Sequence, residues 1–293
     1  MIPRGQAAGI SRRSALQVSG LALAGAALTP GTAQHAHIAF GVNRHYYPAF
    51  TAAVPGTRSV RIYYDAENVF PGHWPDQLPG AWATLSIRPR PRDLLSGKLD
   101  GPIRNLLGTA PDHSELSIWH EAGPGNPLGY PDYVNADNMF HMHAYMQHLC
   151  TGTNVRYGSI ICGPANQCQP WLGRNLDWYG VDLYDNSRYH NPDGTLNPAK
   201  LYSRMDANLA MWRVVAGTEH PSIRLCETNS PFDSHRRHWF SLIATWMARH
   251  NGRRILTYWN SAEGKARGGL SGPWPPSHEV VLHLHHLVTT YGG

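Results

Sequence analysis

Two glutamates stand where an apolar run gives way to a loop, a position in which a carboxylate can do acid–base chemistry. The run "ELSIWHE" ends on Glu121, and the Gly/Pro-rich segment 122–127 follows at once. Glu227 lies in the same way near the end of "SIRLCET". Burying a lone carboxylate is costly, so each needs a partner, water or a substrate. Two carboxylates that face each other are the apparatus of glycosidic bond cleavage, in which one donates a proton and the other attacks or activates water.

Eight short apolar runs are the elements that must position these side chains. They cover residues 37–43, 59–65, 82–89, 115–121, 155–163, 176–184, 222–228 and 254–260. Helical stripes separate the later runs, for example Met139, His143, Met146 and Cys150. Strands that alternate with helices favour a parallel sheet with right-handed crossovers. Eight such units in about 250 residues predict a single (β/α)8 TIM barrel. The alternative, a doubly wound open sheet, would need a Gly-rich phosphate loop, and the sequence has none.

In such a barrel, the carboxyl ends of all eight strands meet on one face, where active sites form. Strands four and seven lie roughly opposite each other, so Glu121 and Glu227 are expected to converge over the centre. A lone strand-end glutamate is more often an ion-pair partner. We predict a retaining pair, for which the two carboxyl groups lie about 5–5.5 Å apart, against about 6.5–9.5 Å for an inverting pair.

Several short motifs carry a family resemblance. They are the pair His120-Glu121, "SIRP" (86–89), "GVDLY" (180–184) and "YWN" (258–260). With these motifs the chain resembles the clan A retaining glycosidases, and within them glycoside hydrolase family 26 and its relatives, which include mannanases. The resemblance implies that Glu121 is the acid/base, Glu227 the nucleophile, and His120 a neighbour of the reacting sugar. The segment after Glu121 departs from the family pattern, which bears on the substrate.

The resemblance also implies roles around the pair, each with a plainer alternative. Tyr184 would hydrogen-bond Glu227, or be a core tyrosine. Trp259 would lie under the sugar, or pack the barrel. Arg88 would contact the substrate or lower the pKa of Glu227, or form an ion pair with Asp65 or Asp182. Further substrate-binding candidates at strand ends are Asp182, Asn229 and Asn43, and the tryptophans Trp74, Trp82, Trp119, Trp171 and Trp274 are candidates for sugar subsites.

No pattern indicates a metal or cofactor, although the chain has 18 histidines. The pair His35 and His37 precedes the first strand, and His141 and His143 point apart on a helix. We therefore expect no metal and no cofactor. Two alternatives stay open: an inactive barrel that only binds glycans, and a metal-dependent barrel hydrolase. A serine hydrolase is disfavoured because the chain has no G-x-S-x-G elbow.

The N-terminus has the features of an export signal. Arg12-Arg13 precede an apolar run, Leu16 to Leu28, and small residues follow at 31–33. The run is too short to span a bilayer. We expect a twin-arginine-type signal peptide over 1–33, with Sec export as the alternative, and a catalytic barrel over 34–293. The mature protein would be secreted or bound to the cell envelope, with no membrane contact after cleavage.

The charge and the cysteines narrow the partners and the chemistry. The net charge is +5, and without the three arginines of the N-terminal segment, 22 basic groups face 20 acidic ones. No basic run follows, so a nucleic-acid partner is not indicated. A monomer that acts on a poly- or oligosaccharide is expected. Export permits disulfides; of the four cysteines, Cys162 and Cys168 are the favoured pair, and Cys226 reads as a buried thiol.

Overall fold

The computed structural model describes residues 38–44, 47–75, 81–124, 130–230, 233–250, 254–258 and 277–292. These lie in one compact unit, His35–Gly293. The predicted signal segment, Trp259 and Trp274 lie outside the described residues.

Eight strands close into a single barrel and follow one another in chain order. Every neighbouring pair is parallel, including the closing pair of the first and last strands. The strands are β1 (Ile38–Asn43), β2 (Ser59–Glu67), β3 (Trp82–Arg88), β4 (Ser114–Ile118), β5 (Val155–Ile161), β6 (Trp178–Tyr184), β7 (Ile223–Asn229) and β8 (Arg254–Tyr258). The predicted (β/α)8 barrel is therefore confirmed.

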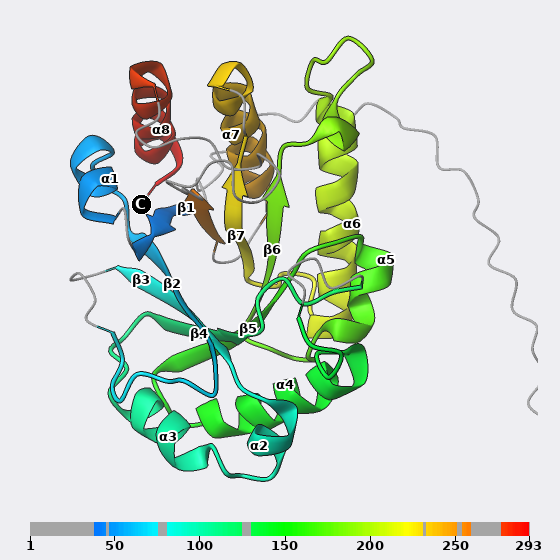
Figure 1. Cartoon of the computed structure of the whole chain (residues 1–293). Coiled ribbons are helices and arrows are strands. Elements are labelled where there is room, and N and C mark those ends of the chain that lie inside the picture. The colour runs from blue at the N-terminus through cyan, green and yellow to red at the C-terminus, as the bar shows by residue number, and fades with distance from the viewer. Residues whose placement is uncertain are drawn as a thin grey trace, which may run out of the picture. The chain divides into compact units, whose positions relative to one another are not determined.

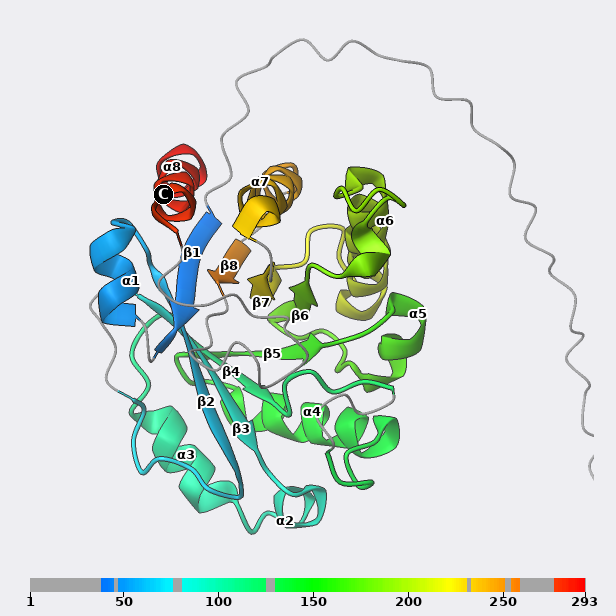
Figure 2. The same cartoon turned by 45° about the horizontal axis from the view of Figure 1, so that its top comes forward.

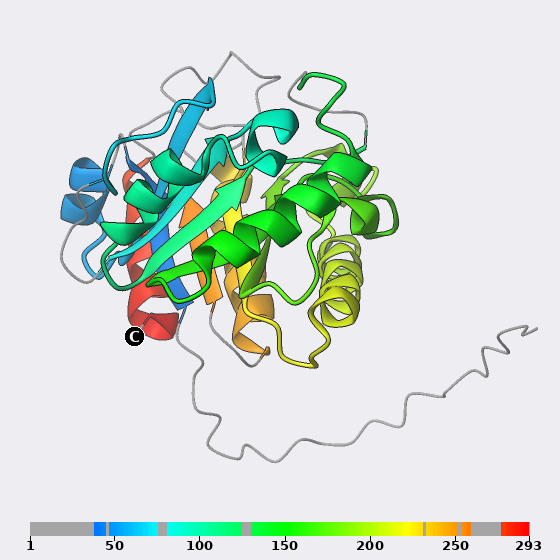
Figure 3. The same cartoon turned by 90° about the horizontal axis from the view of Figure 1, so that it is seen from below.

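Helices cover the outside of this ring (Figure 1), and the view tilted towards the strand ends shows them surrounding it (Figure 2). From below, α4 and α3 cross the outer face of the strands (Figure 3). They are α1 (Tyr47–Ala53), α2 (Pro91–Leu95), α3 (Asp100–Gly108), α4 (Ala136–Cys150), α5 (Ala165–Cys168), α6 (Pro198–Ala216), α7 (Asp233–Ala248) and α8 (His278–Tyr291), with 3₁₀ turns η2 (Gln169–Trp171) and η3 (Ser187–Tyr189). None of the helices in the described part of the chain is both long and apolar enough to cross a bilayer.

The helix boundaries follow from local sequence chemistry. The Asn135 side chain accepts a hydrogen bond from the Asn138 backbone and caps α4, and Asn197 caps α6 in the same way. An N-cap oxygen satisfies a backbone N–H that the helix itself leaves open. Helix α6 ends at Gly217, whose φ of 62° suits glycine. The apolar stripes that predict α4 and α6 face the barrel and are buried.

The inside of the barrel carries polar side chains as well as apolar ones. The Arg61 guanidinium from β2 is 1% exposed, and its Nη2 donates to Ser86 Oγ at 2.6 Å. Ser86 Oγ in turn lies 2.6 Å from Ser117 Oγ on β4. Gly158 on β5 makes room for the Trp178 ring of the neighbouring strand β6, because a Cβ at this position would lie 2.1 Å from that ring. Only glycine permits this approach.

All four cysteines are free, so the expected Cys162–Cys168 disulfide is wrong. The Cys168 thiol points towards the backbone of Cys162 and lies 3.7 Å from its carbonyl oxygen. A disulfide needs the two sulfurs to meet at about 2.05 Å. Cys226 is buried, as predicted, at 2% exposure.

Candidate active site

The chain leaves β4 through a turn with unusual backbone geometry. Strand β4 ends at Ile118, three residues earlier than predicted, because Trp119 (φ 42°) and Glu121 (φ 60°) both adopt left-handed conformations. Such angles cost free energy in residues other than glycine and cluster at functional sites. The turn is anchored by the buried Trp119 ring, whose Nε1 donates to the Pro89 carbonyl at 2.7 Å. It places Glu121 at the carboxyl-end face of the barrel, where it is 8% exposed.

Glu227 lies in β7 with a tyrosine hydroxyl at each of its oxygens. Tyr63 from β2 donates to Oε1, and Tyr184 from the end of β6 donates to Oε2. The predicted contact between Tyr184 and Glu227 is therefore present. Burial, and then the negative charge of Glu227, raise the pKa of both tyrosines well above their ordinary value. Both hydroxyls therefore stay protonated and keep donating, which favours the ionised form of the carboxylate.

Three acidic side chains converge at this face. Carboxylate oxygens of Glu121, Asp182 and Glu227 all lie within 4.8 Å of one another, and all three side chains are buried. Asp182 sits on β6 opposite Glu227, at a point where the pairing of β6 and β7 shifts register. Burial, then the charges of Glu227 and Glu121, raise the pKa of Asp182 well above its usual range. This shift favours the neutral form of Asp182, whereas Glu121 and Glu227 stand at strand ends as the two carboxyl groups that can divide the roles of acid and base.

Arg61 supplies positive charge beneath these acids. Burial alone would lower its pKa, but Tyr63, Cys226, Asp182 and Glu227 around it raise the pKa above the ordinary arginine value. Its guanidinium carbon lies 4.7 Å from the centroid of the Tyr63 ring. A fixed charge at this place offsets the cost of burying an anion at Glu227.

His120 packs against Tyr63, one of the two tyrosines that contact Glu227. It is 5% exposed, and its ring packs edge-on against Tyr63 with centroids 4.9 Å apart. Tyr130 donates to the His120 carbonyl oxygen at 2.7 Å and so supports the turn from behind. The imidazole therefore belongs to the same cluster as Glu121 and Glu227.

Other predicted residues occupy different places around the site. Arg88 forms an ion pair with Asp65 at 2.6 Å, which is the alternative raised for it above. The Asn229 side chain accepts from the Ser230 backbone at 2.8 Å. Asn43, at the end of β1, lines a depression of about 520 Å³ that is open to solvent. Arg61 and Tyr63 line the same depression.

The predicted aromatic subsites are mostly placed elsewhere. Trp74 and Trp119 are 3% and 1% exposed, so neither offers a face to a sugar. Trp82 opens β3, at the opposite end of the strand from the acids. These three assignments are wrong because the rings fill the protein interior or lie at the other end of the barrel. Trp171, in η2, is only partly buried.

Sequence reasoning missed Tyr63 and Arg61. Both lie on β2, two residues apart, so they project to the same face of the strand. The signal was present in "SVRIYYD", where arginine and tyrosine interrupt an otherwise apolar strand in alternation. An arginine inside a fully buried strand indicates a buried acidic partner.

Two groups of described residues have donor atoms close enough to hold a metal ion. One is the trio of acids, Glu121, Asp182 and Glu227, and the other is Asp185, His190 and His235. In the first, both oxygens of Glu227 already accept tyrosine hydroxyls, and burial beside two other acids raises the pKa of Asp182. The second contains the imidazoles that transition metals prefer.

Comparisons with known proteins return structures but no sequence relatives. No protein-family model matches the chain, and no curated protein matches it. A GH26 β-mannanase from Bacteroides ovatus is similar, with a TM-score of 0.57, 12% identity, and coverage of 87% of this chain and 89% of that one. A GH5-4 broad-specificity endoglucanase from Clostridium longisporum has a TM-score of 0.55 and 13% identity, with coverage of 83% and 86%.

A third similar structure is a GH5 xyloglucan-specific endo-β-1,4-glucanase from a metagenomic library, in complex with cellotriose. It has a TM-score of 0.50 and 11% identity, and the match covers 85% of this chain and 96% of that one. At this level of identity, the comparisons establish a shared fold. The fold is the barrel of GH5 and GH26 glycoside hydrolases, as the motifs around Glu121 imply.

Proposed function

We propose that this protein is a retaining glycoside hydrolase that cleaves a poly- or oligosaccharide with two glutamates. The observation that carries the proposal is the approach of Glu121 and Glu227. Their carboxylate oxygens lie within 4.8 Å of each other at the carboxyl ends of β4 and β7. The 4.8 Å limit joins one oxygen of each residue, and such a close approach supports the carboxyl separation of about 5–5.5 Å that a retaining enzyme needs.

In the proposed first step, Glu227 is the nucleophile. Its ionised oxygen attacks the anomeric carbon while Glu121 donates its proton to the leaving glycosidic oxygen. The products of this step are a sugar esterified to Glu227 and the released alcohol. Tyr63 and Tyr184 suit the nucleophile role because both donate to Glu227 and hold its carboxylate in place.

In the second step, Glu121 acts as the base. It takes a proton from a water that attacks the same anomeric carbon, and Glu227 leaves as a carboxylate. Both residues thus return to their starting states, and the configuration at the anomeric carbon is retained. The raised pKa of Asp182 favours its protonated form, which would place no further negative charge beside the ionised nucleophile.

The substrate class is supported by the open depression and by the similar proteins. The depression is lined by Asn43, Arg61 and Tyr63, and Tyr63 is also a hydrogen-bond partner of Glu227. One similar structure holds cellotriose, and another is a β-mannanase. We propose a sugar chain as the ligand, with His120 and Asn43 as candidates to contact it, whereas the buried Asn229 side chain is occupied by the Ser230 backbone.

The remaining parts of the proposal concern the whole chain. Residues 1–33 are proposed as an export signal on the strength of Arg12-Arg13 and the apolar run behind them. The barrel would then act as a monomer outside the cytoplasm. N-terminal sequencing of the protein released by cells that express the full chain tests this, since processing near residue 34 is expected.

The test of the function compares purified variants on a panel of mannans, xylans, β-glucans and arabinogalactans. Glu121→Ala and Glu227→Ala are each expected to lose about 10³-fold or more of the hydrolysis rate. Glu219→Ala, at an exposed ion pair with Arg213, is the control and should retain full activity. Unchanged hydrolysis in both site variants would rule the proposal out.

Two further measurements test the stereochemistry of cleavage and the role of Glu121. NMR of the first product should show the anomeric configuration of the substrate, and an inverted product would exclude the double displacement. Added azide should restore turnover of an activated aryl glycoside by Glu121→Ala, because a small anion needs no base to attack the glycosyl ester. Wild-type protein that binds a glycan of the panel but hydrolyses none would support an inactive binding barrel instead.

A further inference from the structure

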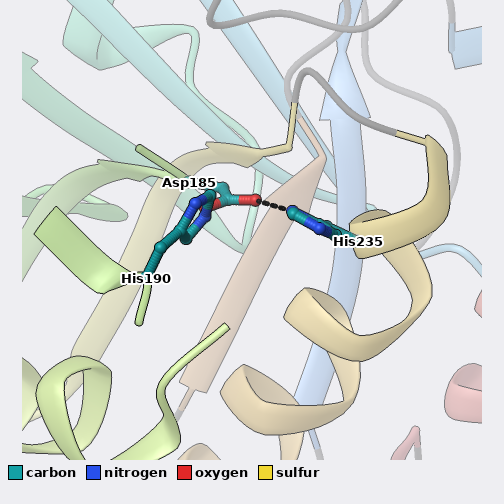
Figure 4. Close-up of side chains that lie close together, drawn as sticks. All are labelled: Asp185, His190 and His235. Carbon is teal, nitrogen blue, oxygen red and sulfur yellow. Dashed lines mark hydrogen bonds and ion pairs between the residues drawn. The ribbon is translucent and has the colours of Figure 1, made fainter. Parts of the chain in front are cut away.

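We propose that Asp185, His190 and His235 form a binding site for a single divalent transition-metal ion, of which Zn²⁺ is the model. The three side chains are separate from the acids of the proposed sugar site. Each offers one donor atom, and the three donor atoms lie within 4.8 Å of one another. Figure 4 shows the Asp185 carboxylate between the two imidazole rings.

The donor atoms are close enough together to surround one tetrahedral metal ion after a small adjustment. His190 Nε2 lies 2.6 Å from Asp185 Oδ1, and His235 Nδ1 lies 3.5 Å from Asp185 Oδ2. Ligands of tetrahedral zinc at about 2.0–2.1 Å have donor atoms roughly 3.3 Å from each other. The two measured distances involve different oxygens of Asp185, so one of these oxygens would bind the ion and the imidazoles would turn towards it. Donor atoms that already lie within 4.8 Å of one another need only a small movement for this. The two rings stand nearly perpendicular, at 87°, with centroids 5.1 Å apart, so their nitrogen lone pairs can converge without stacking.

The donor set is chemically suited to zinc. Two imidazoles and one carboxylate are the protein ligands of many open zinc sites, in which a water fills the fourth position. The exposure pattern leaves such a position. The Asp185 side chain is fully buried, whereas the side chains of His190 and His235 are 12% and 26% exposed. A metal would thus be held from below by the carboxylate and reached from solvent past the rings.

Neighbouring contacts hold the ligands in place. Ser230 Oγ donates to Asp185 Oδ2 at 2.8 Å, and the Asp185 backbone N–H donates to the backbone carbonyl oxygen of Asn229 at 3.0 Å. His190 pairs with Leu196 through a backbone bridge, and Lys200 Nζ donates to its carbonyl oxygen at 2.5 Å. Hydrogen bonds that orient ligands in this way tune and strengthen metal binding.

The site also joins elements that are separate in the chain. Asp185 directly follows β6, His190 follows η3, and His235 lies in the first turn of α7. A bound ion would link the segment that follows β6 to the first turn of α7. Asp185, which begins this segment, is the residue directly after Tyr184 of the proposed sugar site. The competing explanation is a hydrogen-bonded Asp–His network that has no metal, and such a network would not bind Zn²⁺ at one site per chain.

The experiment is calorimetric titration of Zn²⁺ into tag-free protein that has been stripped with a chelator. We expect one site per chain with a Kd in the micromolar range or tighter. His190→Gln and His235→Gln should each weaken this site by about 100-fold or more. His141→Gln is the control: it removes an exposed histidine that forms an ordinary surface pair with Asp137, and it should leave the site intact.

Cobalt provides a second readout that does not depend on affinity alone. Co²⁺ bound by two imidazoles and a carboxylate should give visible absorption in the wild type and in His141→Gln, and none in the two site variants. The proposal is overturned if Zn²⁺ binds to His190→Gln and to His235→Gln as tightly as it binds to the wild type. It is also overturned if the wild type binds Zn²⁺ no more tightly than the double variant His190→Gln/His235→Gln. Circular dichroism and a melting curve for each apo variant confirm that it is folded, so a lost site means lost ligands.

None of these readouts depends on sugar cleavage. A chain that binds zinc but hydrolyses no glycan would support this site and reject the proposed function. A chain that hydrolyses a glycan but binds no zinc would support the proposed function and reject this site.

Discussion

Glu115 and Arg224 form a bidentate ion pair across the interior of the barrel. Arg224 Nη2 lies 2.5 Å from Glu115 Oε1, and its Nε lies 3.1 Å from Oε2. Both side chains are fully buried. Because β4 and β7 are not neighbours in the ring, the pair bridges the two strands whose ends carry Glu121 and Glu227.

Breaking this pair from one side should destabilise the fold strongly. Arg224→Met leaves Glu115 as a buried charge that has lost its closest partner, so we expect the free energy of unfolding to fall by about 3–5 kcal/mol in denaturant titrations. The double variant Glu115→Leu/Arg224→Met should recover most of that loss. Arg213→Met, at the exposed Arg213–Glu219 pair, is the control and should change stability by less than about 1 kcal/mol. A small loss in Arg224→Met would contradict the assigned role.

The tyrosines that contact Glu227 should matter for rate and for its pH dependence. Tyr63→Phe and Tyr184→Phe each remove a hydrogen bond to a charged group, worth about 1.5–3 kcal/mol, so kcat should fall roughly 10- to 100-fold. Without a donor the carboxylate is easier to protonate, so the acidic limb of the pH–activity profile should move to higher pH.

The matched control for these two variants is Tyr145→Phe. Tyr145 also donates to a carboxylate, Asp100 Oδ1 at 2.9 Å, but does so between the outer helices α3 and α4. Its rate and pH profile should match those of the wild type. Equal behaviour of all three variants would show that the tyrosine contacts only support packing.

Asp182 should make stability depend on pH. Its pKa is raised by burial and by Glu227 and Glu121, so the folded state keeps a proton that the unfolded state releases above about pH 3.9. Folding is then penalised as pH rises, by up to about 1.4 kcal/mol per pH unit. The difference in unfolding free energy between Asp182→Asn and the wild type should therefore grow in favour of the variant as the pH rises above about 4. The exposed Asp132→Asn should show no such growth.

His143 should make stability depend on pH in the opposite sense to Asp182, with stability lost as the pH falls. Burial lowers the pKa of His143 to about 4, and its ring nitrogens lie 2.7 Å from the Tyr157 hydroxyl and 3.2 Å from Ser159 Oγ. The folded state stays neutral while the unfolded state binds a proton below about pH 6.5. Stability present above that pH is lost as pH falls towards 4. Unfolding curves of His143→Gln should show a shallower decline over this window, whereas the exposed His141→Gln should follow the wild type.

The cysteines should titrate as four thiols once the protein is unfolded without reductant. In the native state they should react slowly with a thiol reagent, because burial raises the pKa of Cys168 to about 11 and that of Cys150 to about 12. Two titratable thiols in the unfolded, unreduced chain would instead indicate a disulfide.

The barrel and its two facing glutamates could be predicted because both depend on patterns along the chain. Apolar runs of strand length locate the eight strands to within a few residues. Strand ends in a parallel barrel share one face, which brings Glu121 near Glu227. The contact of Tyr184 with Glu227 follows from the same rule, since both lie at the carboxyl ends of adjacent strands.

Other features depend on contacts that no local pattern specifies. Tyr63 contacts Glu227 from the far side of the ring, and Glu115 finds Arg224 across it. His190 and His235 meet only because a segment after β6 folds back towards the first turn of α7. The end of β4 was placed three residues too late because tryptophan and glutamate give no sign of a left-handed backbone. Aromatic abundance could not separate Trp74 and Trp119, which are interior, from cleft residues.

The left-handed backbone at Glu121 has a consequence for how this chain can change. A glycine there would relieve about 1–2 kcal/mol of local strain, so selection for thermodynamic robustness alone would favour Glu121→Gly. The protein has a glutamate at this position in spite of the strained backbone angle. The single substitution Glu121→Gly would therefore raise thermodynamic stability and remove the proposed acid/base at the same time.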